Sequence, residues 1–322
     1  MSAPVALYVD PEGMDLPIGL LSEAGFVPRI ANPRGEAELI EVVRATQPRA
    51  LLVSYLPVTD SVLAAAPELG IVSVGAVGYD CVDVAAATRR GVWVTNVPDA
   101  ATDEVATHAL SMALALVRHL PFLDRQVRDG GWDYEATGAP KPLAELTLGI
   151  VGLGRIGRRL AELARGLFGA VVGHDPVVEE RKWPGAVRRM EFEECLRASD
   201  VLSLHVPLSA DTTSLLDART LALLPVGAFV VNVSRGRLID RDALLAALDS
   251  GAIAGAAVDV ADPEPPASDD PLRHHPRVLI TPHAAFYSAR ALRNYALMQA
   301  ANVIAWHHEG SPNTPVNDPR GR

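Results

Sequence analysis

Cysteine is scarce in this sequence: Cys81 and Cys195 are the two thiols among 322 residues. Two thiols so far apart argue against a disulfide-linked scaffold and against a cysteine-ligated zinc site, so we expect no bound metal. Free thiols persist in reducing compartments, and we therefore expect the protein in the cytoplasm.

Long apolar runs and an excess of positive charge are also absent. The longest clean apolar stretch, Ala109–Val117, is interrupted by Ser111 and falls well short of the roughly 18 residues that suggest a membrane-spanning helix. Residues 1–13 contain no lysine or arginine, unlike a secretory signal peptide. With 29 Lys and Arg against 39 Asp and Glu, the formal charge is −10, which disfavours nucleic acid and anionic membranes as partners.

What the sequence does contain is an alternation of strand-like and helix-like segments. Val5–Val9, Ala50–Ser54 and Ile71–Val74 have the pattern of strands, with a helical pattern over Glu36–Thr46 between the first two. A long apolar-rich helix is predicted over Asp103–Arg118, and a second series of strands and helices follows it. This order predicts βαβ units and parallel sheets, so the fold class is α/β.

The chain is long enough for two domains of the usual size, roughly 100–200 residues each. A terminal helix is predicted over Ala289–Glu309, and the proline-rich tail after it is a surface strap or a frayed end. We expect a Rossmann-type nucleotide domain, residues 100–287, inserted into a smaller flavodoxin-like substrate domain, residues 1–99 plus 288–322, with a cleft between them.

A glycine-rich loop in the middle of the chain indicates a dinucleotide site. Gly152, Gly154 and Gly157 fit the G-x-G-x-x-G pattern between an apolar strand, Leu148–Val151, and a helical run, Ile156–Arg165. The first glycine permits a tight turn, the second lets the backbone approach a pyrophosphate, and the third lets helix and strand pack closely. Glycine-rich turns are also common structural punctuation, but this one has the flanking strand and helix that nucleotide binding requires.

Asp175 follows the strand-like run Ala170–His174, where a carboxylate is expected to bind the adenosine ribose. A 2′-phosphate on the cofactor would be repelled there, and Pro176–Val178 supplies no cation to offset the repulsion. The sequence therefore favours NAD over NADP.

Three polar residues, Arg235, Glu264 and His283, each lie just beyond a short apolar run. In an open α/β sheet, ligands bind outside the carboxyl ends of the strands. Hydride transfer to a 2-oxo acid needs a cation for the carboxylate, a proton donor for the carbonyl oxygen, and a group that keeps this donor protonated. Arginine, histidine and glutamate suit these three tasks in turn. The plainer alternatives are a surface arginine, a solvated loop acid and a histidine that satisfies a backbone carbonyl.

Taken together, these motifs resemble the D-isomer-specific 2-hydroxyacid dehydrogenase family from about Val5 to Asn317. The resemblance rests on these segments: Gly152–Gly157, Asn232–Gly236, Asp259 with Glu264–Pro265, Thr281–His283, Val77–Asp80 and Asn96–Pro98. Within the family, Thr281–Ser288 is most similar to the C-terminal binding protein branch. That branch typically carries tryptophan at the position of Phe286 and arginine at that of Val74.

The resemblance implies catalytic roles for the three polar residues. Arg235 would bind the substrate, His283 would be the acid/base, and Glu264 would pair with His283. The backbone of Val77 and Gly78 would hold the substrate carboxylate. The resemblance also implies a homodimer formed through the nucleotide domains.

Cofactor contacts follow from the same resemblance and from the glycine loop. Arg155 and Ile156 would touch the pyrophosphate, Val206 and Pro207 would line the adenosine side, and Asp259 would contact the nicotinamide amide. The full expected set is Gly152, Gly154, Arg155, Ile156, Gly157, Asp175, Val206, Pro207, Val233, Ser234, Asp259, Ala284 and Ala285.

An NAD-dependent D-2-hydroxyacid dehydrogenase, or 2-oxoacid reductase, is the leading functional hypothesis. The alternatives are an NAD-sensing scaffold like the corepressors of the resembling branch, and a dehydrogenase of a phosphorus oxyacid. For the substrate pocket, Tyr55, Val74–Gly78 and Phe286 supply apolar and aromatic surface without lysine or arginine. Since an unpaired buried charge is costly, we predict an uncharged, small-to-medium side chain in preference to a phosphorylated one.

Overall fold

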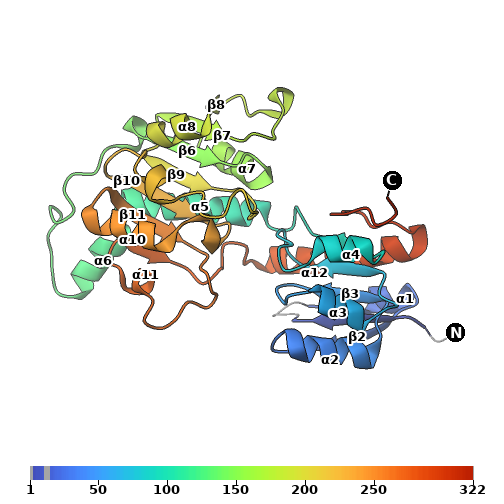
Figure 1. Cartoon of the computed structure of the whole chain (residues 1–322). Coiled ribbons are helices and arrows are strands. Elements are labelled where there is room, and N and C mark those ends of the chain that lie inside the picture. Colours follow the sequence, from blue (N-terminus) through green and yellow to red (C-terminus); the bar gives the residue numbers. More distant parts are fainter. Residues whose placement is uncertain (1–2, 11–14, 322) are drawn as a thin grey trace. The chain divides into compact units, whose positions relative to one another are not determined.

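Residues 3–10 and 15–321 are described by the computed structural model, and they form two α/β units (Figure 1). The first unit contains Met1–Ala101 and Tyr287–Arg322, and the second contains Thr102–Phe286. The second unit is therefore inserted into the first, as the sequence predicts.

The first unit is built on a five-stranded parallel sheet. Its strands are β1 (Val5–Val9), β2 (Val27–Ala31), β3 (Ala50–Val53), β4 (Ile71–Val74) and β5 (Trp93–Thr95). They lie in the order β2-β1-β3-β4-β5, and every neighbouring pair is parallel. This is the flavodoxin-like strand order.

Helices cover both faces of this sheet because successive side chains of a strand point to opposite faces. Ala6 and Tyr8 of β1 pack in one core cluster with residues of α1 (Ile18–Glu23) and α12 (Ala289–Glu309). Leu7 and Val9 pack in a second cluster with residues of three other helices, which are α2 (Glu36–Thr46), α3 (Asp60–Ala65) and α4 (Val84–Arg89). Burial on both faces explains why the central strands β1 and β3 are apolar along their whole length.

The tail beyond α12 runs along the outer edge of β5. Pro315 forms a β-bridge with Thr95, and the Val316 N–H donates to the Val94 carbonyl over 2.8 Å. The Asn317 side chain accepts a hydrogen bond from the Val94 N–H over 2.7 Å. The sequence leaves open whether the tail is a surface strap or a frayed end, and these bonds show that it is a surface strap.

The second unit is built on a seven-stranded parallel sheet. Its strands are β6 (Thr147–Val151), β7 (Ala170–His174), β8 (Arg188–Arg189), β9 (Val201–Leu204), β10 (Ala228–Asn232), β11 (Ile253–Val258) and β12 (Val278–Ile280). They lie in the order β12-β11-β10-β9-β6-β7-β8, which is the Rossmann order extended by one strand. The strand order reverses between β6 and β9, and doubly wound sheets bind nucleotides at such a point.

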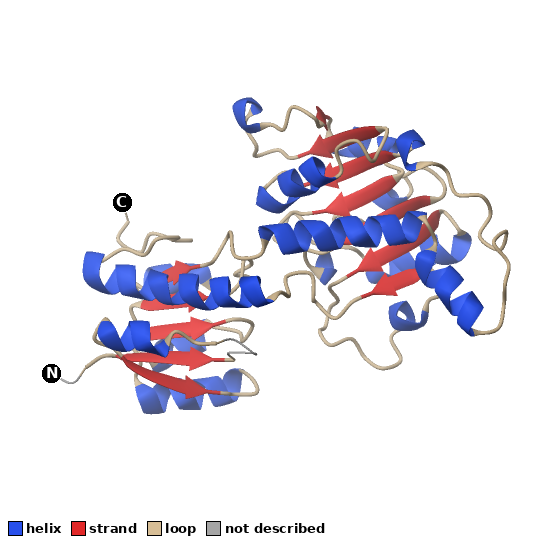
Figure 2. Ribbon diagram, turned by 180° about the vertical axis from the view of Figure 1, so that it is seen from behind, coloured by secondary structure: helices blue, strands red, loops and turns tan. Residues whose placement is uncertain are grey.

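Figure 2 shows helices on both faces of the second sheet. On one face, α5 (Thr102–Val117) packs against α7 (Arg155–Leu163) and contacts β10 and β11. On the other, α8 (Phe192–Ala198), α9 (Ala218–Leu221) and α10 (Arg241–Ser250) contribute side chains to one core cluster. The remaining elements of this unit are α6 (Leu120–Arg128), α11 (Pro271–His274) and 3₁₀ turns at Leu143–Glu145, Glu180–Lys182 and Gly236–Leu238.

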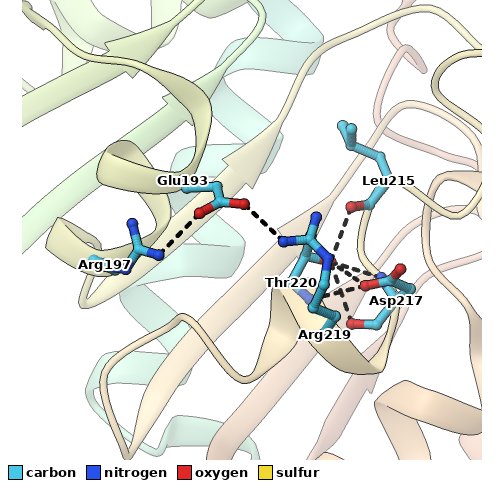
Figure 3. A network of polar contacts seen from close by, with 6 residues as sticks. All are labelled: Glu193, Arg197, Leu215, Asp217, Arg219 and Thr220. Atoms are coloured by element: carbon cyan, nitrogen blue, oxygen red, sulfur yellow. Dashed lines mark hydrogen bonds and ion pairs between the residues drawn. The ribbon is translucent and has the colours of Figure 1, made fainter.

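A polar network at the surface ties α8 to α9 (Figure 3). The Glu193 carboxylate accepts hydrogen bonds from Arg197 over 2.9 Å and from Arg219 over 2.7 Å. Asp217 and Thr220 cap the start of α9 reciprocally, each side chain bonding to the other's backbone N–H. The network orders a short helix that has little propensity of its own.

Helix α6 follows the helix predicted over Asp103–Arg118 and lies in a segment for which the sequence predicts no element. Pro121 lies in its first turn, where backbone N–H groups have no acceptor within the helix. Proline, which has no N–H, therefore costs no hydrogen bond at this position. None of its side chains is fully buried, although the helix contacts α5. Throughout the described residues, no helix has the length and apolar character needed to cross a membrane.

Candidate active site

Arg235, Glu264 and His283 follow three neighbouring strands at the same edge of the second sheet. Arg235 comes just after β10, Glu264 after β11, and His283 after β12, and these strands are adjacent and parallel. Their carboxyl ends therefore meet at one edge. The three residues share this edge with the glycine loop after β6.

Glu264 and His283 are in direct contact. His283 Nδ1 lies 2.7 Å from Glu264 Oε2, and Glu264 Oε1 accepts a hydrogen bond from the Ala261 N–H over 2.8 Å. Partial burial would raise the pKa of Glu264, but the bonds from His283 and Ala261, together with the nearby Arg235 cation, hold this pKa below its usual value. The carboxylate is therefore ionised at neutral pH and fixes the imidazole ring from the Nδ1 side.

The backbone of His283 is bent to present its ring. Its φ angle is +51°, in the left-handed region that few residues other than glycine adopt. The His283 N–H donates to the Asp259 carbonyl over 2.7 Å, and the ring of Phe286 meets the imidazole edge-on with 6.2 Å between centroids. Phe286, an expected wall of the substrate pocket, thus lies beside the acid/base candidate.

Asp259 holds the loop that carries His283. Its carboxylate, which is 1% exposed, accepts hydrogen bonds from the Thr281 hydroxyl and from the N–H groups of Ala284 and Ala285. His108 Nε2 of α5 lies 3.1 Å from Thr281 Oγ1 and 3.6 Å from the Asp259 carboxylate. The sequence does not predict that Thr281 and His108 contact each other beside Asp259, because only the fold brings α5 next to this loop.

Arg235 is oriented by the turn in which it lies. Asn232, at the end of β10, donates from its side-chain amide to the Arg235 carbonyl over 2.8 Å and accepts from the Ser234 N–H over 3.0 Å. The Ser234 hydroxyl donates to the Leu204 carbonyl on β9 over 2.9 Å. Because Asn232 is buried, this turn is anchored in the sheet while the Arg235 side chain stays partly exposed.

A cavity of about 380 Å³ opens beside the pair, lined by Asp259, Glu264, Pro265, Thr281, Pro282 and His283 among others. A larger cavity of about 490 Å³ shares Val260 and Ala261 with it but contains none of the three predicted catalytic residues. The smaller cavity is the candidate site, because the paired side chains of Glu264 and His283 line it. Across the described residues, no cluster of three His, Cys, Asp or Glu side chains is arranged to hold a metal ion.

The glycine loop has the geometry that a pyrophosphate requires. Gly152 has a φ of +95°, and a Cβ atom there would lie 2.6 Å from the His205 carbonyl. A Cβ on Gly157 would lie 2.0 Å from the Gly152 oxygen, so helix α7 packs directly on the turn. Nothing lies within 4 Å of the corresponding position on Gly154, which precedes the start of α7. The space beside Gly154, at the N-terminus of α7, is therefore open to a pyrophosphate, and a helix N-terminus favours such an anion.

Asp175 lies directly after β7 and is bonded to the glycine loop. Its carboxylate accepts from the Leu153 N–H over 2.7 Å, and from the Val177 and Val178 N–H groups over 2.9 and 3.1 Å. A carboxylate has about four acceptor positions, so these bonds leave room for a ribose hydroxyl. The residues present therefore fit NAD.

The other predicted site residues lie at strand ends in both units. Val206 and Pro207 follow β9, Val233 and Ser234 follow β10, and Ala284 and Ala285 follow β12. In the first unit, Tyr55 follows β3 and is 44% exposed. Val77 and Gly78 follow β4, and the Asn96 side chain donates to the Val77 carbonyl over 2.7 Å, a contact that sequence reasoning missed.

Comparison with known proteins gives one consistent family. Residues 110–285 match the model of the D-isomer specific 2-hydroxyacid dehydrogenase NAD binding domain. A glyoxylate reductase of Korarchaeum cryptofilum is 40% identical over 277 residues, which are 83% of this chain and 82% of that protein. The crystal structure of D-lactate dehydrogenase from Aquifex aeolicus, complexed with NAD and lactic acid, has 25% identity and a TM-score of 0.85 and covers 96% of this chain and 98% of that one.

The branch predicted within the family was wrong. The relatives found are glyoxylate reductases and D-3-phosphoglycerate dehydrogenases, not C-terminal binding proteins. A D-3-phosphoglycerate dehydrogenase of Bacillus subtilis is 36% identical over 284 residues, but these are 85% of this chain and only 54% of that protein. The prediction of that branch rested on Thr281–Ser288, a single short segment, whereas the match to the glyoxylate reductase extends over 277 residues.

Proposed function

Since the chain belongs to the D-isomer specific 2-hydroxyacid dehydrogenase family and is an NAD-dependent oxidoreductase, we propose that it interconverts a small 2-oxo acid and its D-2-hydroxy acid at Arg235, Glu264 and His283. The observation that supports these three residues most strongly is the 2.7 Å contact between His283 and Glu264 beside the Arg235 cation. A surface histidine and a solvated loop acid would have no reason to pair at the carboxyl edge of the sheet.

Arg235 binds the substrate carboxylate. The planar guanidinium matches a carboxylate with two parallel hydrogen bonds, which fixes both position and rotation. In the first unit, Val77 and Gly78 are the substrate-binding residues we propose, and Asn96 holds the peptide between them by bonding to the Val77 carbonyl. These contacts leave the carbonyl carbon as the reacting atom.

His283 supplies the proton. Its Nδ1 is engaged by Glu264, so the proton goes from Nε2 to the substrate carbonyl oxygen during reduction and returns to Nε2 during oxidation. The ionised Glu264 accepts a hydrogen bond from Nδ1 and keeps the ring in this orientation. The bound cofactor would supply a hydride to the substrate carbon as NADH during reduction, and would accept it as NAD⁺ during oxidation.

The cofactor is held along the edge of the second sheet. The glycine loop with Arg155 and Ile156 binds the pyrophosphate, and Asp175 binds the adenosine ribose, so NADH is preferred over NADPH. Val206 and Pro207 line the adenosine side. Asp259 contacts the nicotinamide amide through Oδ2, which accepts one hydrogen bond from Ala285 and has capacity for a second. The remaining contacts come from Val233, Ser234, Ala284 and Ala285.

The preferred substrate is a 2-oxo acid with a small, uncharged side chain. Tyr55 and Phe286 face it with aromatic surface, and neither can neutralise a phosphate. The 40% identical relative is named a glyoxylate reductase, which agrees with a compact substrate. The phosphoglycerate dehydrogenase relatives make 3-phosphohydroxypyruvate the substrate to exclude experimentally.

Two copies of the chain pair through the segment after α5. Leu120 and Val127 of α6 are 56% and 47% exposed, and Trp132 and Tyr134 beyond it are 90% and 85% exposed. Large apolar side chains at such exposure mark interaction surfaces. A homodimer in the cytoplasm is the arrangement we propose, and it would cover the exposed apolar side chains of α6.

The test is NADH oxidation by the purified protein with a panel of 2-oxo acids. The panel contains glyoxylate, 2-oxo acids with progressively longer apolar side chains, and 3-phosphohydroxypyruvate. We expect turnover, with the highest kcat/KM on a small uncharged member. Absence of turnover with every 2-oxo acid would contradict the proposal, and turnover of phosphite with NAD would then support the phosphorus-oxyacid alternative. Binding of NADH with no turnover of either class would support a scaffold.

A further inference from the structure

A carboxylate in the first unit lies beside the loop that carries Tyr55. Strands β1 and β3 are paired in register, with Tyr8 opposite Leu52. Two residues further along, the chain reaches Asp10 on one side and Ser54 on the other. Asp10 therefore lies next to the loop Ser54–Pro57, although it is far from it in sequence.

Three consecutive N–H groups of this loop converge on Asp10. Oδ1 accepts from the Ser54 N–H over 2.8 Å, and Oδ2 accepts from the Tyr55 and Leu56 N–H groups over 2.8 and 2.9 Å. Hydrogen bonds to an ionised carboxylate are roughly twice as strong as neutral ones. Asp10 also has a φ of +48°, a left-handed conformation in which aspartate is among the few enriched residues. The backbone therefore turns directly after β1, at Asp10, whose side chain binds the loop Ser54–Pro57.

The other end of the loop is anchored separately. The Val58 N–H donates to the Cys81 carbonyl over 2.8 Å, and the Asp83 N–H donates to the Val58 carbonyl over 3.0 Å. Ser54 is 4% exposed, whereas Tyr55 is 44% exposed. The loop is therefore held at both ends while Tyr55 is exposed. Asp10 binds three N–H groups at its beginning, where the Cys81 thiol also lies 3.9 Å from the Ser54 carbonyl.

We propose that Asp10 is a positioning residue for substrate specificity: it fixes the loop Ser54–Pro57 so that Tyr55 presents one defined surface to the substrate side chain. The inference rests on the proposed function, in which Tyr55 contacts that side chain. Asp10 acts through the loop backbone and does not touch the substrate. Its loss should therefore change which 2-oxo acids are accepted, and should leave NADH binding and proton transfer intact.

The experiment compares Asp10→Asn and Asp10→Ala with the wild-type protein. Asparagine keeps the shape but replaces one accepting oxygen with an amino group that faces a backbone N–H. We expect the ratio of kcat/KM for 2-oxo acids with longer apolar side chains to that for glyoxylate to change by about tenfold in both variants, the usual effect of a modest apolar contact. The change should lie mainly in the KM of the longer substrates, because Tyr55 contacts their side chains and not the reacting atoms. Glyoxylate is the reference, since it has no side chain for Tyr55 to contact. The dissociation constant of NADH should stay within about twofold.

Asp83→Ala is the matched control. Asp83 also accepts a backbone N–H, that of Ala86 over 2.8 Å, but it caps helix α4. Both alanine variants should lower the thermal midpoint, whereas only Asp10→Ala should alter selectivity. Amide hydrogen exchange gives a readout that needs no turnover: exchange at Ser54–Leu56 should accelerate in the Asp10 variants and not in Asp83→Ala.

The outcomes separate this inference from the proposed function. Unchanged selectivity in active Asp10 variants, or unchanged exchange at Ser54–Leu56, would overturn the role of Asp10 alone. An equal loss with every substrate would also overturn it, because that result indicates general damage. A wild-type protein that turns over no 2-oxo acid would overturn the proposed function, and the specificity role of Asp10 with it.

Discussion

Single side chains at the carboxyl edge of the second sheet have tasks that their chemical relatives cannot perform. Arg235 offers a planar fork, and His283 offers a nitrogen that can gain and lose a proton near neutral pH. Glu264 fixes the His283 ring from the other side. Conservative substitutions therefore test the assignment of each role.

Replacement of Arg235 by lysine tests the binding of the substrate carboxylate. A lysine ammonium keeps the charge but cannot form two parallel hydrogen bonds, so the substrate loses its fixed orientation. We expect kcat/KM to fall by about 100-fold, the scale of loss that misorientation of a reacting group causes. Steady-state kinetics with the best 2-oxo acid measure this, with Arg237→Lys, an exposed neighbour, as the control. Near wild-type efficiency in Arg235→Lys would remove Arg235 from substrate binding.

The depressed pKa of Glu264 makes a prediction about stability and pH. Ionisation of this carboxyl group is favoured in the folded state. Its contribution to stability is therefore complete above the pKa of an unfolded glutamate, about 4.3, and is lost as the pH falls through the lower pKa of the folded state. Glu264→Gln lacks this contribution at every pH.

We expect wild type to be more stable than Glu264→Gln at pH 7, with a difference that shrinks below about pH 4.3. Denaturant unfolding of both proteins at pH 7 and at several acidic pH values measures this difference. Glu41→Gln, on an exposed position of α2, is the control and should show no such trend. A constant difference between wild type and Glu264→Gln down to pH 3 would show that the His283 pair does not stabilise the carboxylate.

At the scale of elements, the packing of β6, its loop and α7 decides whether the cofactor binds. Gly157 is needed because any side chain there would collide with the Gly152 carbonyl. Gly154 is different, since the space beside it is open in the protein alone, and in the proposed function the pyrophosphate occupies it. The two glycines therefore serve the fold and the ligand separately.

Alanine substitutions can separate these two requirements. Gly157→Ala should lower the thermal midpoint and weaken NADH binding at least about tenfold, because α7 must move away from β6. Gly154→Ala should weaken NADH binding similarly while leaving the thermal midpoint nearly unchanged. NADH fluorescence titration and thermal unfolding give the two readouts, with Gly19→Ala in α1 as the control. Full NADH affinity in Gly154→Ala would contradict the position given to the pyrophosphate.

Much of this arrangement is predictable from the sequence because it depends on local pattern. The strands before Arg235, Glu264 and His283 are short apolar runs, and the glycine spacing identifies the nucleotide loop. Helix α6 is not predictable in this way, because none of its side chains is buried and no apolar face is hidden within the described chain. The contacts of His108 with Thr281 and of Asp10 with Ser54 depend on which strands and helices become neighbours, which sequence periodicity does not reveal.

At the scale of the whole molecule, the exposed segment around Trp132 predicts association. The double variant Trp132→Ser, Tyr134→Ser should shift a wild-type dimer toward monomer at micromolar concentration, because large aromatic anchors dominate such interfaces. Sedimentation velocity measures the change. Val226→Ser, another apolar residue that is 89% exposed, is the matched control and should leave the dimer intact. A monomeric wild type, or a double variant as dimeric as wild type, would contradict the proposed interface.

The central claim is that this NAD-dependent enzyme uses His283 to transfer the proton that accompanies hydride transfer. The most direct measurement is kcat for NADH-dependent reduction of the best 2-oxo acid by wild type and by His283→Ala, together with the NADH dissociation constant of each. The account predicts that kcat falls about 10²–10⁴-fold, the usual contribution of general acid catalysis, while the dissociation constant stays within about twofold. Wild-type turnover in His283→Ala would contradict it.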